Sequence, residues 1–257
     1  MTESNASAAG MLSGGVSVVT GLIGAVIASF LVTSIGMNLF ERSELEKKTT
    51  AEVEQVPSGE QQKILAAEFN KRAAKHCLVW YSAAGAVIGG LMGVGIAFTT
   101  RFNTGLAIAA PLLSTAVAGL AVGPISISLA EMVDSNRDGL NPSDLYIMLM
   151  HGTVWAILGA AIGLGIALAA PDRRFFLPRL IGAGAFGGIL GGAFMHLPGG
   201  MLLASTDFSI NIPNPDDSYG RLYYFCFPML FVSFIVGHTA ATESPAAASE
   251  SSEPAAA

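Results

Sequence analysis

The sequence predicts an all-α fold, a polytopic membrane bundle of about six transmembrane helices with glycine-rich packing faces. Of its 257 residues, 52% are apolar and 12% charged, whereas soluble domains carry roughly 25% charged residues. The charges cluster and leave long uncharged stretches, and 30 residues are glycine. This composition excludes an ordinary soluble enzyme. A net charge of −6 without a basic patch excludes a nucleic-acid partner, and two cysteines exclude a disulfide scaffold.

The transmembrane helices are predicted from length, because a bilayer core of about 30 Å takes about 20 apolar helical residues. The stretches that reach or approach this length are 15–40, 77–99, 105–129, 145–169, 180–204 and 222–238. The last stretch is short and HLPGG interrupts the fifth, so five spans are the alternative. Residues 1–14 form a short polar N-terminus without Lys or Arg, which predicts a retained first span rather than a signal peptide.

Residues 41–76 form a charged linker with helix-forming composition. Ser58 and Gln61 resemble a capping box that opens a helix through Lys75. Its apolar residues share one side of that helix: Ile64, Leu65, Phe69 and Ala73. This stripe favours a short helical hairpin packed on itself at the bilayer face, and the alternative is a partner-binding or membrane-surface stripe.

The remaining soluble segments are a loop and a tail. Residues 205–221 are turn-rich, and residues 239–257 are rich in Ala, Ser, Pro and Glu, which predicts a disordered tail. An even number of spans places both termini on one face of the membrane. Lys and Arg are more numerous on the opposite face because of the linker, which favours outward termini.

An internal duplication is predicted for residues 76–129 and 151–204, each a two-helix hairpin. The pattern H-x-x-V-W begins both, at 76–80 and 151–155, and contains both tryptophans of the chain. Trp and His at a span end are typical of anchors at the headgroup level. The alternative for His76 and His151 is a proton relay or a metal pair.

Small residues recur every fourth position in five of the predicted spans, a pattern typical of a glycine zipper. Its clearest runs are Gly85-Gly89-Gly93 and Gly184-Gly188-Gly192. Small residues let helix backbones approach closely in lipid, where the hydrophobic effect between helices is weak. The pattern predicts a tightly packed bundle, with partner helices in this chain or in a second copy.

One loop resembles the start of a calcium-binding EF-hand loop. Asp134, Asn136 and Asp138 stand at its first, third and fifth positions, and Gly139 at the sixth. The twelfth position is Leu145, and Asp144 lies one residue early, so the bidentate carboxylate is missing. The alternatives are an ordinary tight turn and a degenerate calcium loop.

The sequence offers no catalytic, cofactor-binding or metal residue that we would assign. It lacks a G-x-S-x-G elbow, an H-E-x-x-H pair and a carboxylate dyad within the spans, and the predicted spans contain no charged residue between their ends. Pro111 and Pro124 interrupt the third span beside serine and threonine hydroxyls, an arrangement that lines a substrate site in some transporters.

The chain is therefore predicted to be a non-enzymatic structural or assembly component of a membrane, typical of a bacterial inner membrane, with the lipid bilayer and a second copy or another membrane protein as partners. The alternative is a small-solute transporter or channel built from two parallel hairpin repeats.

Overall fold

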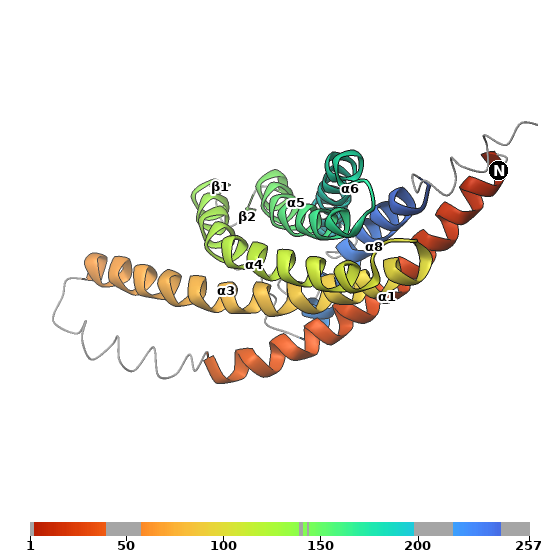
Figure 1. Ribbon diagram of the computed structural model, residues 1–257. Coiled ribbons are helices and arrows are strands. Elements are labelled where there is room, and N and C mark those ends of the chain that lie inside the picture. The colour runs from red at the N-terminus through yellow and green to blue at the C-terminus, as the bar shows by residue number, and fades with distance from the viewer. Residues whose placement is uncertain (1–2, 40–57, 139–140, 143, 198–217, 243–257) are drawn as a thin grey trace, which may run out of the picture.

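The computed structural model describes residues 3–39, 58–138, 141–142, 144–197 and 218–242. Six long helices form nearly all of these residues (Figure 1). They are α1 (Glu3–Leu39), α3 (Ser58–Thr99), α4 (Thr104–Ser135), α5 (Asp144–Ala169), α6 (Arg173–Phe194) and α8 (Ser218–Thr242). A two-residue antiparallel pair, β1 (Arg137–Asp138) with β2 (Asn141–Pro142), joins α4 to α5. Each helix holds an apolar stretch long enough to cross a bilayer. The predicted all-α, multi-pass membrane bundle is confirmed.

The fifth span differs most from its prediction. It occupies α6, Arg173–Phe194, instead of 180–204, so HLPGG lies beyond the helix end. Asp172 starts this helix early, because its carboxylate accepts a hydrogen bond from the Phe175 amide at 3.2 Å. Arginines in the first two turns are tolerated because their long stems reach the polar surface, and the Arg179 guanidinium lies 3.6 Å from the Phe175 ring centre.

The terminal helices are longer than predicted. α1 begins at Glu3, so residues 3–14 are helical rather than a separate polar segment. α8 extends into both the predicted loop 205–221 and the predicted tail 239–257. The rest of that loop and tail, like residues 40–57 of the linker, lies outside the described residues.

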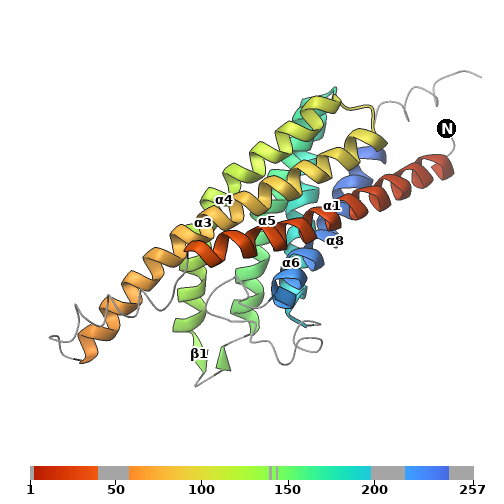
Figure 2. The same cartoon turned by 90° about the horizontal axis from the view of Figure 1, so that it is seen from below.

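The linker helix and the second span form one continuous helix. α3 runs from Ser58, the predicted capping residue, to Thr99. Figures 1 and 2 show its N-terminal part projecting beyond the other helices. The side chains of the apolar stripe from Ile64 to Ala73 lie outside the described set, so the hairpin and its surface-binding alternative stay predictions.

The six helices form a closed ring in which each packs mainly on two neighbours, in the order α1, α3, α4, α5, α6, α8 and back to α1. The strongest pairs, α3 with α4 and α5 with α6, are the two hairpins of the predicted repeat. Gly10 of α1 lies beside His238 and Thr242 of α8, so these helices are antiparallel. The Ser13 hydroxyl is 2.9 Å from that of Thr99. The start of α1, the end of α8 and the α3–α4 turn therefore share one end of the bundle.

Glycines occupy the closest approaches between helices. A methyl group added at Gly93 would overlap the Ala107 carbonyl of α4, and one added at Gly163 would overlap the Leu180 carbonyl of α6. Glycines also lie at the other interfaces: Gly165 against Pro111, Gly187 against Val232, Gly24 against Ile88, and Gly21 against the Ser233 side chain. A glycine therefore marks a close approach in every neighbouring pair of the ring, and the contact at Gly24 is the least tight of these.

The third span, in α4, continues as a helix through Pro111 and Pro124. Nearby hydroxyls bond to backbone carbonyls of adjacent helices: Ser114 donates to Ala161 of α5 at 2.7 Å, and Thr115 donates to Gly85 of α3 at 2.7 Å. These bonds join α4 to both its neighbours, so the polar groups beside Pro111 serve packing in this structure.

Candidate functional site

The interior of the ring contains a cluster of aromatic rings and one histidine, which we call the aromatic centre. It consists of Trp80 and Tyr81 of α3, His151 and Trp155 of α5, and Tyr224 and Phe225 of α8. The rings pack directly on one another. The Trp80 and Phe225 ring centres lie 4.8 Å apart, and those of Trp155 and Tyr224 lie 5.8 Å apart. Aromatic rings at these separations attract one another beyond simple burial.

The aromatic centre also contains polar groups, the hydroxyls of two tyrosines and the ring of a histidine. The Tyr81 and Tyr224 hydroxyls are 2.7 Å apart, a fully buried hydrogen bond between α3 and α8. The His151 ring lies edge-on to Tyr224, with ring centres 5.6 Å apart. His151 is 6% exposed, and its Nδ1 has no hydrogen-bond partner among the described residues. This nitrogen could accept or donate one further bond.

The two tryptophans are not surface anchors. Trp80 and Trp155 are each 1% exposed and turn inward to Tyr224 and Phe225. The sequence interpretation was wrong on this point, because α8 closes the ring and its Tyr224 and Phe225 side chains reach inward to pack on both tryptophans. The relay alternative for His76 and His151 stays a prediction, and among the described residues no group of three His, Cys, Asp or Glu could hold a metal.

The cysteines Cys77 and Cys226 are both free thiols, Cys77 buried and Cys226 half-buried. They form no disulfide with each other, and a buried free thiol such as that of Cys77 packs as a small apolar side chain.

The calcium-like loop is described only in part. The Asn136 side-chain amide donates a hydrogen bond to the Met132 carbonyl at 2.7 Å and so closes the end of α4. The side chains of Asp134, Asp138 and Asp144 lie outside the described set, as does Gly139. The use of Asn136 at the helix end fits the ordinary-turn alternative.

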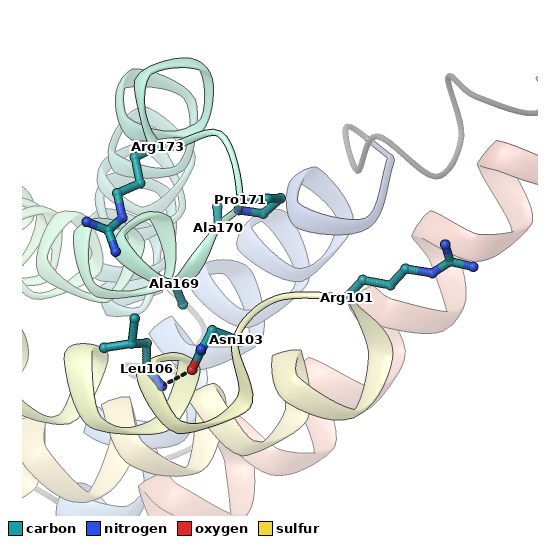
Figure 3. Close-up of a pocket in the computed structure, with 7 residues that line it drawn as sticks. All are labelled: Arg101, Asn103, Leu106, Ala169, Ala170, Pro171 and Arg173. Atoms are coloured by element: carbon teal, nitrogen blue, oxygen red, sulfur yellow. Dashed lines mark hydrogen bonds between the residues drawn. The ribbon is translucent and has the colours of Figure 1, made fainter. Parts of the chain in front are cut away.

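The second candidate site lies at the bundle end that carries the turns 100–103 and 170–172, which we call the turn face. A depression of about 470 Å³ opens between these turns (Figure 3). Its lining residues are Arg101, Asn103, Leu106, Ala169, Ala170, Pro171 and Arg173. It therefore combines two cationic side chains with apolar walls.

Two turn-to-helix contacts fix this depression. Asn103 caps α4, because its side-chain oxygen accepts from the Leu106 amide at 3.0 Å. The backbone N–H of Asn103 donates a hydrogen bond to the Ala169 carbonyl at 3.1 Å and links the two turns. Beneath them, the buried rings of Phe102 and Phe176 meet edge to face with centres 5.2 Å apart. These contacts hold the two turns against each other.

The chain matches no known family model, no curated protein and no solved structure.

Sequence reasoning found neither site as such. The H-x-x-V-W pattern contains three members of the aromatic centre, Trp80, His151 and Trp155, but nothing in the pattern indicated Tyr224. Arg101 and Arg173 lie at the same end of the bundle. Their position on one depression depends on the packing of α4 against α5, which periodicity does not reveal.

Proposed function

We propose that this chain is a non-enzymatic structural or assembly component of a membrane, with a bacterial inner membrane as its location. The observation that carries the proposal is the close glycine packing at every interface of the ring, mostly against backbone and, between α1 and α8, against side chains such as those of Ser233 and Ser17. Such packing fixes helix positions at the cost of mobility, as a scaffold requires.

Glycine zippers and cross-helix hydroxyl bonds act together in this proposal. On α3, Gly85 and Gly89 pack against Thr115 and Pro111 of α4, while the Thr115 hydroxyl bonds to the Gly85 carbonyl. Close approach brings the hydroxyl within reach of the carbonyl, and the hydrogen bond then fixes the register. Interhelical hydrogen bonds in a membrane contribute about 0.6 kcal/mol on average.

A small-solute transporter or channel is the second candidate, and a specific observation favours it. The buried polar atoms that have no hydrogen-bond partner among the described residues include Ser17 Oγ, Ser233 Oγ, His151 Nδ1 and Trp155 Nε1. Buried polar groups are ordinarily bonded, and water or a passing solute would satisfy them.

Cysteine accessibility separates the two candidates. In a Cys77→Ala/Cys226→Ala background, Ser126→Cys and Ser17→Cys place near-isosteric thiols at buried positions, and Gly105→Cys places one at an exposed position of the turn face. A membrane-impermeant thiol reagent should label Gly105→Cys and leave the other two unlabelled until the protein is denatured. Labelling of Ser126→Cys or Ser17→Cys in the native protein would support a hydrated pathway instead.

Self-association is part of the assembly proposal and needs its own test. The ring presents lipid-facing apolar side chains such as Leu113, Val117 and Phe186, which a second copy could cover. Crosslinking in native membranes should yield a defined oligomer. Recovery of monomer alone, under conditions that crosslink a known dimer, would contradict self-association.

A further inference from the structure

The depression on the turn face gathers positive charge at the end of two hairpins. Arg101 and Arg173 are exposed on its two sides, and neither forms an ion pair with a described residue. In Figure 3 the Arg101 side chain extends toward α1, while the Arg173 guanidinium lies over the end of α5. Asp172 is the single carboxylate of the two turns, and it is engaged at the Phe175 amide.

Backbone geometry adds to this positive potential. Both α4 and α6 begin beside the depression, at Thr104 and Arg173. A helix N-terminus carries a partial positive charge, which favours an anion. The side chains of Asn103 and Asp172 already accept from one first-turn amide at each start. Two arginines and two helix starts therefore border the same depression, and the exposed Arg101 side chain, which extends toward α1, must turn back to reach an anion there.

The depression lies at the level of the lipid headgroups. It is bounded by the ends of four spans: Ala74–Thr99, Thr104–Val133, Leu145–Ala169 and Arg173–Phe194. Apolar side chains are exposed at the same end, where Leu106 lines the depression and Phe98 is 82% exposed. A ligand that places an anion between the arginines would lay any attached hydrocarbon chain along these side chains.

We infer that the depression between the turns 100–103 and 170–172 binds the headgroup phosphate of an anionic phospholipid, held by Arg101 and Arg173. Basic pockets between transmembrane helices are suited to such headgroups. Arginine is well matched to phosphate because its planar guanidinium donates two parallel hydrogen bonds. The adjoining apolar walls distinguish a lipid from a soluble phosphate.

The test measures binding of phosphatidylglycerol and phosphatidylcholine to the full-length protein in neutral detergent, by native mass spectrometry with titrated lipid. The wild type should bind phosphatidylglycerol more tightly. Arg101→Gln/Arg173→Gln should weaken that binding about 25-fold, since each basic residue at a lipid surface contributes about fivefold. The matched control, Lys71→Gln/Lys75→Gln, removes the same charge at the opposite end of α3 and should change binding less than twofold.

Three results would overturn the inference. The first is equal affinity of the wild type for the two lipids. The second is an equal loss in the lysine control, which would show general surface charge instead of a site. The third is displacement of phosphatidylglycerol by 10-fold excess inorganic phosphate over lipid, which would show that a soluble anion is the ligand. Unchanged thermal unfolding of the arginine variant without lipid checks that it folds.

Discussion

Gly163 illustrates how single residues set the helix spacing. It lies on α5 against the Leu180 carbonyl of α6, in a space that has no room for a side chain. Gly182, two residues from Leu180 on the same helix α6, has no neighbouring atom within 4 Å of an added methyl group. Two glycines with the same helix propensity therefore differ only in their packing.

Replacing Gly163 with alanine should push α5 and α6 apart and destabilise the bundle by about 1–3 kcal/mol, the usual cost of overpacking. Gly182→Ala should change stability by less than about 1 kcal/mol and can only favour the helix. Thermal unfolding of both variants in the same detergent measures the difference. Equal stability of the two variants would contradict the role of glycine in this interface.

The Tyr81–Tyr224 bond makes a second prediction at the residue scale. Tyr81→Phe should destabilise the protein by about 1–3 kcal/mol, because it leaves a buried Tyr224 hydroxyl without its partner. Tyr224→Phe should act similarly, and the double variant should lose less than the sum of the two. A double-mutant cycle by detergent-induced unfolding gives the coupling. Strict additivity would mean that the two hydroxyls do not stabilise each other.

At the scale of elements, α4 bonds to both neighbours through its hydroxyls. Ser114 donates to Ala161 of α5, whereas the exposed Ser128 reaches only the Pro124 carbonyl of its own helix, at 3.4 Å. Ser114→Ala should therefore destabilise the α4–α5 contact by about 0.6 kcal/mol, and at most about 1.7. Ser128→Ala is the matched control and should have no measurable effect. A larger loss in Ser128→Ala would show that helix α4 itself, and not its contact with α5, depends on these hydroxyls.

The sequence could predict which elements form, because apolar length alone determines a membrane helix. It placed the fourth span at 145–169, where the structure has Leu145–Ala169. It placed the fifth too late, because HLPGG resembled a bend inside a span and the arginines before Leu180 resembled a loop. Arginine stems that reach the headgroups from within a helix make this boundary invisible to a count of charges.

Contacts between distant elements could not be predicted in the same way. The glycine spacing indicates that Gly93 and Gly163 face another helix, but not which helix. Trp80 and Trp155 were assigned to the membrane surface because sequence gives no sign that side chains of α8 pack on both of them. For the same reason, neither Tyr224 nor the depression at Arg101 and Arg173 could be anticipated.

At the scale of the whole molecule, six membrane-spanning helices form a closed ring. Closure requires α1 and α8 to meet, and Gly10 beside Thr242 shows that they do so at the turn face. The α4–α5 connection then lies at the opposite end, because α4 runs away from the turn at 100–103. Both termini of the ring and the two short turns must share one side of the bilayer.

Two-sided thiol labelling tests this arrangement most directly. In the Cys77→Ala/Cys226→Ala background, Gly105→Cys marks the turn face and Ser135→Cys marks the opposite end, both at exposed positions. The protein should stay in the membrane when the vesicles are washed at alkaline pH. In sealed vesicles, an impermeant reagent should label one of the two cysteines from outside and the other only after the vesicles are inverted. Labelling of both from the same side, or release of the protein by the wash, would contradict the six-span bundle.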